Sequence, residues 1–307
     1  MELKNYVYFL VIKILTISAI FYILSENNIN YDTNKVTKIN ISIILLVKNN
    51  INWLRYLHHK FSIIEKNYSN LFDFEFYIFE NNSDDGTKNF IDLFVKERKG
   101  KVLSIDFTEK EMSNYIFDDQ ISKQRGKFMS MIRNKLKDFH GKLKSDYTTI
   151  IDSDVYFDFN IFIKMIEKLH DDKIAMVTPF VTDFTDTLNG GYTHYYDTLA
   201  LKTNSGYSFK KIGTICLFRE CEKCRKLSKL RNLKIKDEDL LDMKGDNNNN
   251  LIDVKSAFGC FAMLRTSVYN KCRWSTDYCE HFSFCKEVKK YGSIVIATDI
   301  KITNNST

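Results

Sequence analysis

The chain has one proline, Pro179, and only 11 glycines among its 307 residues. No stretch is rich in either residue, so nothing resembles a linker between several domains. Neither sign of charge dominates, because 45 Lys and Arg stand against 39 Asp and Glu. The aromatic residues do not alternate with basic ones, which gives no support to a nucleic-acid partner. With 44% hydrophobic residues, the chain can fill one large core.

Cysteine is absent before Cys216, and all seven cysteines lie between Cys216 and Cys285. Cys221 and Cys224 form one C-x-x-C pair, but no second pair follows at zinc-site spacing and no His-x-x-x-His occurs. Disulfides or buried free thiols fit this distribution better than a zinc or redox site. The cysteines therefore leave the redox compartment open.

The longest apolar run covers residues 6–24 and is interrupted only by Lys13, Thr16 and Ser18. As a helix it would span about 28 Å, close to the thickness of a bilayer core. A cleaved signal peptide is the rival interpretation, but the expected small-residue cleavage site is poor. We expect an uncleaved anchor over residues 1–25 and a polar stem over residues 26–38. A weak charge bias favours a cytoplasmic N-terminus, with the body on the far side, as in an ER or Golgi lumen.

From residue 39 onward the hydrophobic pattern alternates between strand and helix. Such alternation predicts one α/β domain over residues 39–307, with a mainly parallel, Rossmann-like sheet flanked by helices. Residues 220–245 are highly charged and predict a helix-containing excursion. The predicted strands are 39–47, 74–79, 101–106, the segment from Tyr147, 174–177 and 293–297, with apolar signal again at 257–264; the predicted helices are 51–67, 87–97, 121–143, 161–170 and 280–291.

Two carboxylates, Asp152 and Asp154, end the β-branched strand at residues 148–151. Side chains at i and i+2 of an extended segment point the same way, and open α/β sheets bind ligands beyond the carboxyl ends of their strands. Two hard oxygen donors at that edge suit a divalent cation and, through it, a diphosphate. The alternative is that the aspartates end the strand and cap the helix starting near Asp158. A calcium loop is excluded, because Tyr156 and Phe157 stand where an EF-hand needs an oxygen ligand and a glycine.

A second polar stretch, residues 80–87 (ENNSDDGT), follows the strand predicted at 74–79. A strand that runs into such a loop and then a helix is typical of ligand-binding loops. Glu80 can accept hydrogen bonds from a nucleobase or ribose, and Gly86 permits close backbone approach. The same residue types also make an ordinary turn with a helix cap.

Taken in order, the loop at 80–87, Arg133-Asn134 and Asp152-Ser-Asp154 resemble the GT-A-type nucleotide-sugar glycosyltransferases. The segments 195–201 (YYDTLAL), 258–263 (FGCFAM) and 279–285 (CEHFSFC) are similar to the fungal capsule-associated mannosyltransferase family and its viral and bacterial relatives. The resemblance covers about residues 39–302. It implies a GT-A fold and a metal-dependent enzyme that moves a sugar to a glycan or glycoconjugate hydroxyl. Mannose from GDP-mannose is the best guess at the donor.

The resemblance also implies roles for single residues. In such enzymes the acidic residue that corresponds to Glu280 faces the acceptor hydroxyl. It would be the general base of an inverting enzyme or would position the acceptor in a retaining one. The residues implied for nucleotide-sugar binding are Glu80, Asp85, Arg125, Arg133 and Asp152; for Mn²⁺ or Mg²⁺, Asp154, Asp152 and His281; and for the acceptor or sugar, Asp197 and Gly259.

Some of these assignments have open alternatives. These enzymes usually take a metal-binding histidine from a later position, but none of the six histidines follows His281, so that ligand is missing or replaced. Glu280 could instead cap a helix, and His281 could be a surface residue. For the whole chain, the rivals are a non-catalytic nucleotide- or glycan-binding protein and a nucleotidyltransferase. The nucleotidyltransferase ranks last, because residues 47–52 contain no glycine for a phosphate loop.

Overall fold

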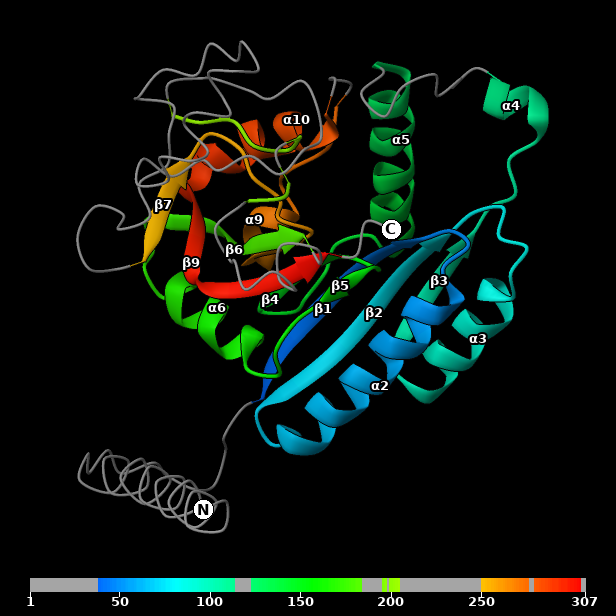
Figure 1. The fold of residues 1–307 in the computed structure, drawn as a ribbon, viewed down its shortest axis with the longest axis horizontal. Helices are drawn as coiled ribbons and strands as arrows, with labels where there is room; N and C mark the ends of the chain where they lie inside the picture. Colours follow the sequence, from blue (N-terminus) through cyan, green and yellow to red (C-terminus); the bar gives the residue numbers. More distant parts are fainter. Residues whose placement is uncertain are drawn as a thin grey trace, which may run out of the picture. The chain divides into compact units, whose positions relative to one another are not determined.

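The computed structural model describes residues 38–113, 123–183, 195–197, 199–204, 250–275 and 279–304. The anchor expected over residues 1–25, nearly all of the stem, the excursion expected at 220–245 and three cysteines lie outside these residues. Among the residues described, none of the helices is long and apolar enough to cross a bilayer. The described part forms a nine-stranded mixed sheet with helices packed against it (Figure 1).

The first half of the chain builds a parallel block in the order β3-β2-β1-β4. Connections through helices bring each strand back in the same direction, as crossover geometry requires. Val47, Glu80 and Asp152 therefore end their strands at one edge of the sheet. The strands are β1 (Ile39–Val47), β2 (Phe72–Glu80), β3 (Gly100–Ser104) and β4 (Tyr147–Asp152), and the helices are α2 (Ile51–Asn67), α3 (Thr87–Glu97), α4 (Glu109–Ser113) and α5 (Lys123–His140).

The second half continues the sheet in the order β4-β8-β6-β9-β5, with β7 also paired to β9. β8 runs antiparallel to β4 and β6, while β5 and β7 run antiparallel to β9. The elements are β5 (Val155–Tyr156), α6 (Ile161–Leu169), β6 (Ile174–Asp183), β7 (Leu251–Val254), β8 (Phe261–Arg265), α9 (Thr266–Tyr269), α10 (Glu280–Val288), the 3₁₀ helix η2 (Lys289–Tyr291) and β9 (Ser293–Asn304).

The expectation of a mainly parallel sheet is thus correct for the first four strands and wrong for the whole. Four of the described pairings, those of β8 with β4 and β6 and of β9 with β5 and β7, are antiparallel. The physical reason is connectivity. β8 does not follow a helix that returns the chain across the sheet, so nothing forces it to run parallel to its neighbours.

The core has one layer on each face of the parallel block. Phe61 of α2 packs edge-on against Phe76 of β2 with ring centroids 4.8 Å apart, and Phe76 contacts Phe94 of α3 at 5.0 Å. On the other face, Tyr77 meets His140 of α5 at 4.9 Å. Figure 1 shows α2 and α3 along one side of these strands and α5 along the other. Successive side chains of β2 point to opposite faces of the sheet, so Phe76 and Tyr77 are both buried but in opposite layers.

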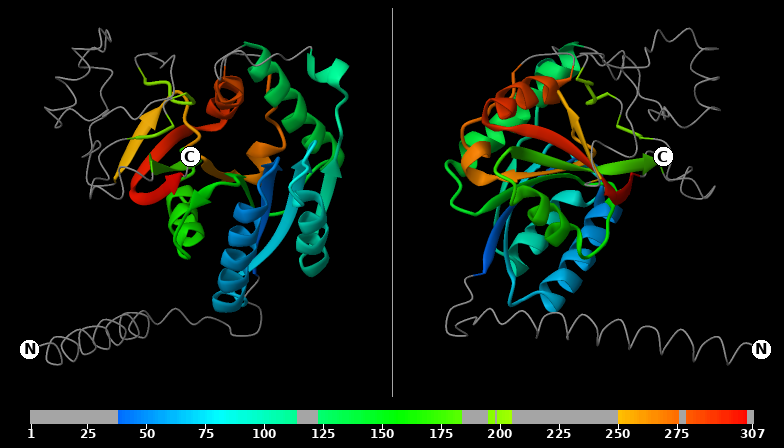
Figure 2. Two further views of the ribbon diagram at one scale, coloured as in Figure 1. Left: turned by 45° about the vertical axis from the view of Figure 1, so that its right-hand side comes forward. Right: turned by 90° about the vertical axis from the view of Figure 1, so that its left-hand side faces the viewer.

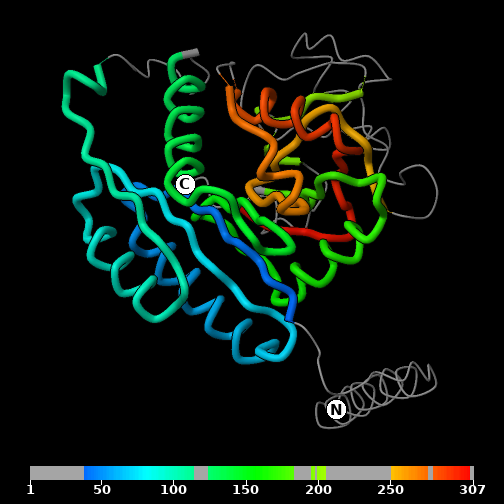
Figure 3. Tube along the Cα trace, turned by 180° about the vertical axis from the view of Figure 1, so that it is seen from behind, coloured from blue at the N-terminus to red at the C-terminus, as the bar shows by residue number. Residues whose placement is uncertain are grey.

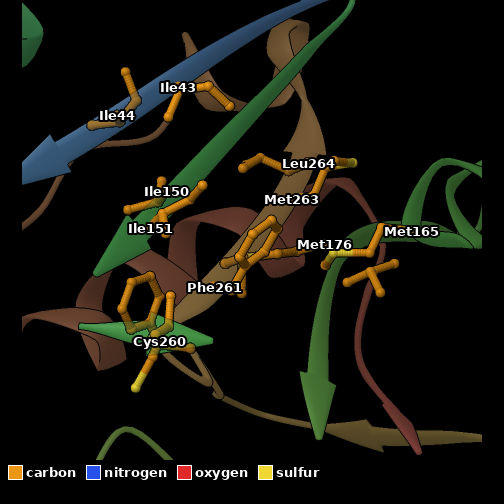
Figure 4. Close-up of a cluster of buried hydrophobic side chains, with 14 of the residues drawn as sticks. Ile43, Ile44, Ile150, Ile151, Met165, Met176, Cys260, Phe261, Met263 and Leu264 are labelled. Carbon is orange, nitrogen blue, oxygen red and sulfur yellow. The ribbon is translucent and has the colours of Figure 1, made fainter. Parts of the chain in front are cut away.

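A second part of the core lies where the two halves of the sheet meet. Figure 4 shows buried side chains of β1, β4 and β8, among them Ile43, Ile150 and Met263, gathered in one cluster. All three are at most 1% exposed. Apolar packing therefore continues across the antiparallel junction of β4 and β8, which holds the ends of these strands in register for the site described below.

The C-terminal segment returns to the first half through α10. In two further views and from behind, α10 lies beside α5 (Figures 2 and 3). The last strand, β9, runs to Asn304, well beyond the expected end at residue 297. A register shift in its pairing with β6, between Pro179 and Phe180, accommodates the extra residues. β9 thereby reaches β5, where Val155 pairs with Asn304.

Candidate functional site

A cavity of about 510 Å³ opens at the carboxyl edge of the parallel strands. It is lined by four carboxylates from three segments of the chain and by several cations. We call it the acidic cavity. The charged residues in its wall are Asp152, Asp154, Asp197, Glu280, Lys48, Arg125 and Arg133. The structure thus brings together most of the residues predicted for the site.

The segment that carries Asp152 and Asp154 is held by one backbone and one side-chain hydrogen bond. The backbone N–H of Asp152 donates to the carbonyl of Cys260 at 2.8 Å, and Asn50 donates its side-chain N–H to Ser153 Oγ at 2.6 Å. Asp152 and Asp154 both line the cavity, as expected for residues i and i+2. The capping alternative is wrong, because α6 begins at Ile161 and Asn160 occupies its N-cap.

Negative charge is costly in this cavity. Burial raises the pKa of Asp152 to about 8; the carboxylate of Asp154 adds to the shift, whereas Arg133 opposes it. Burial also raises the pKa of Asp154. Burial raises the pKa of Asp197 to about 6. The N–H of Gly259, which donates to Asp197 Oδ2 at 2.8 Å, lowers this pKa and so opposes the shift. Several carboxylates in one partly dehydrated space stabilise a bound proton or cation.

Arg133 ties α5 to α10 inside the cavity wall. Its Nε donates to Glu280 Oε1 at 3.2 Å, and one terminal nitrogen lies 3.3 Å from His281 Nε2. The His281 ring stacks on Phe258, with centroids 3.9 Å apart and planes 14° apart. The guanidinium carbon lies 5.9 Å from the centre of the Trp274 ring. The side chains of this group are nearly fully buried in the cavity wall.

The protonation of this group follows from its contacts. Burial alone would raise the pKa of Glu280, but His281, Arg133 and Arg125 lower it to about 2. Burial lowers the pKa of His281 to about 3, and Arg133 adds to that shift while Glu280 opposes it. Arg133 therefore favours the charged form of Glu280 and the neutral form of His281. Glu280 is a weak proton acceptor in this setting.

In the described structure, His281 Nε2 lies 3.3 Å from a terminal nitrogen of Arg133 and 3.3 Å from Glu280 Oε1. Its role as a metal ligand stays a prediction. Neither Glu280 nor His281 is exposed, since they keep 3% and 6% of their surface. The surface alternative for His281 is therefore wrong.

Gly259 supports the site through the backbone. Its φ is +60°, and a Cβ there would come within 3.0 Å of the carbonyl oxygen of Pro179. Only glycine accepts this combination without strain. The backbone of Gly259 thus lies close to Pro179, and its N–H donates to Asp197. The contact of Gly259 with acceptor or sugar stays a prediction. Asp197 itself lines the acidic cavity.

Two carboxylates of the loop at 80–87 accept hydrogen bonds from the protein itself, both within the loop and from neighbouring segments. Glu80 is fully buried; it accepts from the backbone N–H of Ser83 at 2.8 Å and from the hydroxyl of Ser104. Asp85 accepts from the backbone N–H of Ile51 at 3.1 Å and of Thr87 at 3.0 Å. Neither Glu80 nor Asp85 is among the described residues that line the acidic cavity or the cavity beside it. Both carboxylates therefore hold the loop in place, and their contact with a nucleotide stays a prediction.

A second cavity of about 420 Å³ adjoins the acidic one, and we call it the apolar cavity. The two share Leu46, Lys48, Arg125 and Met129. Phe128 and Ile132 of α5 and Met112 provide flat apolar surface, and Asn81 adds a polar group. Lys48 and Asn50 were not predicted, although they lie one and three residues beyond the end of β1, at the ligand-binding edge. Asn81 belongs to the loop predicted at 80–87.

The residues present fit a divalent cation that prefers oxygen. Asp152 and Asp154 supply carboxylate oxygens, and Asn304, which is 3% exposed, lines the same wall with a buried Oδ1 that has no hydrogen-bond partner in the described structure. Its Nδ2 lies 3.5 Å from the carbonyl of Asp154. No three His, Cys, Asp or Glu side chains in the described ranges are close enough to form a metal site. Amide, water and phosphate oxygens would have to complete the shell.

No family model matches the sequence. No protein of curated function matches it either. Among solved structures, similar ones include the mannosyltransferase PcManGT from Pyrobaculum calidifontis in complex with GDP-Man and Mn²⁺, S. aureus TarS 1-349, and GalNAc-T7 with UDP, GalNAc and Mn²⁺.

The likeness to these structures is distant. Identity is 8%, 12% and 9%, with TM-scores of 0.48, 0.45 and 0.44. The matches cover 89%, 87% and 87% of this chain. They cover 58%, 61% and 43% of the other proteins, so the chain spans about three fifths of their length or less. At TM-scores below 0.5 these likenesses establish neither a family nor an activity, and the function has to be drawn from the site.

Proposed function

We propose that the protein is a metal-dependent glycosyltransferase that moves a sugar from a nucleotide sugar to a hydroxyl of a glycan or glycoconjugate. One observation carries the proposal: Asp152, Asp154, Asp197 and Glu280 meet Arg125 and Arg133 in one cavity, beside an apolar cavity that shares its wall. A nucleotide sugar has the same division of chemistry, with a flat base, a charged diphosphate and a polyhydroxyl group. Mannose from GDP-mannose remains our proposal for the donor, on the resemblance of the sequence motifs.

The donor would lie across both cavities. The apolar cavity takes the base against Phe128 and Met129, and Lys48 and Arg125 lie where the two cavities join, beside the phosphates. Asp152, Asp154 and the Asn304 amide would hold Mn²⁺ or Mg²⁺. When bound, that ion would stabilise the charge that develops on the leaving diphosphate. Lys48 and Arg125 would add to that stabilisation in a partly dehydrated space.

Acceptor activation falls to a carboxylate, and the two candidates differ. A general base works best when its pKa lies near the operating pH. Asp197, with a pKa of about 6, meets this condition, whereas Glu280, with a pKa of about 2 and a contact to Arg133, does not. We therefore propose Asp197 as the base of an inverting reaction. Glu280 would fix Arg133 and shape the acceptor side.

The test measures donor binding and turnover in the full chain. Wild type should be thermally stabilised by GDP-mannose only with Mn²⁺, and it should release GDP. Asp154→Asn should lose both effects. Asp158→Asn, four residues away and lining a different cavity, is the matched control and should behave as wild type. Full activity in EDTA would exclude the metal, and donor binding without GDP release would favour the non-catalytic binding protein.

We also propose that residues 1–25 hold the enzyme at a membrane, with the N-terminus cytoplasmic and the domain on the far side. The support is the apolar run at 6–24 and its flanking charges. Protease treatment of sealed vesicles tests the orientation, because the domain should be protected until the vesicles are opened. Digestion of the domain in intact vesicles would reverse the topology.

A further inference from the structure

A third cavity, of about 490 Å³, lies away from the acidic one, between the end of α5 and α9. We call it the basic cavity. Its size is within the range of small-molecule sites. Its walls are Lys137, Asp138, Gly141, Lys142, Ser267, Asn270, Lys271 and Arg273. Four of these residues are cationic and one is acidic.

The positive charge of this cavity is not balanced within the described part of the chain. Asp138 is bound by Arg273, whose two terminal nitrogens donate to its carboxylate oxygens at 2.8 and 2.9 Å. This pair uses the only carboxylate in the wall. Lys137, Lys142 and Lys271 form no ion pair with any carboxylate of the described residues. The wall of the basic cavity thus contains three lysines that have no carboxylate partner among the described residues, two of which contact the rings of Tyr269 and Tyr291.

Lys137 makes the imbalance more than a surface effect. Its side chain is buried, at 7% exposure, and its Nζ donates to the carbonyl of Tyr269 at 2.5 Å and lies 3.8 Å from the centre of the Tyr269 ring. A carbonyl and a ring face are weak partners for a buried charge. Burial lowers the pKa of Lys137 to about 8, and Arg273 adds to the shift. An anion in the cavity would relieve this strain on the charged form.

We propose that the basic cavity binds a phosphate monoester. Three unbalanced ammonium groups exceed what a single carboxylate can neutralise, whereas a phosphate dianion offers two charges and several oxygens. The free donors are ammonium groups, which act as point charges suited to phosphate, while the planar fork of Arg273 is already used by Asp138. Gly141 borders the cavity, and a Cβ there would meet no atom within 4 Å. The ligand therefore has room beside the backbone.

The basic cavity lies near the edge of the sheet where β1 begins. The N–H of Asn40, at the start of β1, donates to Asp146 Oδ2 at 2.8 Å, and the N–H of Thr266, the first residue of α9, donates to the Asp146 carbonyl at 3.0 Å. The basic cavity thus lies at the edge where the chain joins β1, opposite the edge that carries Asp152. The phosphate could belong to a soluble ester or to the headgroup of a lipid.

The experiment uses the full chain in nanodiscs and hydrogen exchange over residues 137–145 and 266–275. The probes are inorganic phosphate added to phosphatidylcholine discs, and discs that contain phosphatidic acid or phosphatidylglycerol. We expect protection of these segments with phosphate or with phosphatidic acid. The double variant Lys142→Glu/Lys271→Glu should weaken this protection at least tenfold in midpoint concentration. Lys96→Glu/Lys255→Glu, with the same change of charge on exposed positions elsewhere, should shift it less than twofold.

Each outcome decides a point. Protection by inorganic phosphate assigns a soluble ligand, and protection by phosphatidic acid alone assigns a lipid headgroup. Equal protection by phosphatidylglycerol, which carries a phosphodiester, or equal loss in both double variants would show unspecific charge attraction and overturn the proposal. So would the absence of protection with any probe. None of these readouts depends on glycosyl transfer.

Discussion

Arg133 and Glu280 lie 147 positions apart in the chain and form a buried ion pair with an Nε to Oε1 distance of 3.2 Å. Both side chains are 4% exposed. The pair links α5, which belongs to the parallel block, to α10, which lies between β8 and β9 in the second half of the chain. Its strength can therefore be measured as the coupling of the two halves of the domain.

Arg133→Ala should lower the free energy of unfolding by about 3–5 kcal/mol, because it leaves the Glu280 charge buried without a partner. Urea unfolding followed by circular dichroism measures the change. Arg273→Ala is the control, since its pair with Asp138 is 53% and 61% exposed and such pairs contribute about 1 kcal/mol or less. Equal losses in the two variants would show that burial of the Arg133 pair has no special weight.

Asn304 is predicted to contribute to cation binding. Asn304→Leu keeps the shape but removes the amide oxygen, and it should weaken Mn²⁺ binding about tenfold or more, a loss typical of residues around metal sites. Asn304→Asp should bind at least as well as wild type. Electron paramagnetic resonance of free Mn²⁺ gives both affinities without any assay of transfer. Unchanged affinity in Asn304→Leu would remove Asn304 from the cation site.

The pH dependence of transfer separates the two candidate bases. With Asp197 as the base, kcat/KM should fall as the pH drops through about 6, the pKa raised by burial. Asp197→Asn should reduce kcat by about 10²-fold or more and abolish this limb of the profile. Glu280→Gln should keep the limb near pH 6, whatever its effect on kcat. A limb that disappears in Glu280→Gln and survives in Asp197→Asn would reverse the assignment.

Asp152 should make the apo protein less stable at alkaline pH. Its folded-state pKa of about 8 lies above the unfolded value near 3.9, so the folded state holds the proton more tightly and stability falls as the pH rises between these values. In urea unfolding, Asp152→Asn should therefore have a higher free energy of unfolding than wild type at pH 8. This advantage should be at least about 1 kcal/mol larger at pH 8 than at pH 4. Saturating Mn²⁺ should shrink the difference by stabilising the carboxylate in wild type. A pH-independent effect would contradict the burial of Asp152.

The periodic spacing of hydrophobic residues along the sequence predicted much of the first half of the fold. The bounds of β1, α2 and α3 agree with the sequence-based ranges, because each has a continuous or one-sided apolar pattern. β5, at two residues, and β7, at four, are too short to leave such a pattern. The extension of β9 was not visible either, since Thr298, Asp299 and Lys301 interrupt its apolar run.

For the candidate site, local spacing found Asp152 and Asp154 but not their partners. The ion pair of Arg133 with Glu280 and the position of Asn304 depend on contacts between segments 147 and 150 residues apart. The turn-like composition of the loop also could not show that the carboxylates of Glu80 and Asp85 accept hydrogen bonds from backbone N–H groups and from Ser104. Those bonds follow from how the loop packs against its neighbours.

The pairing of β5 with β9 sets the order in which the site can assemble during synthesis. Asp154 joins the parallel block early, but the strand that brings Asn304 beside it begins only at Ser293. A nascent chain that has not yet released β9 from the ribosome therefore carries Asp152 and Asp154 without the wall that completes their cavity. Contacts of such long sequence separation form late, so cation binding should be acquired as one of the last steps of folding.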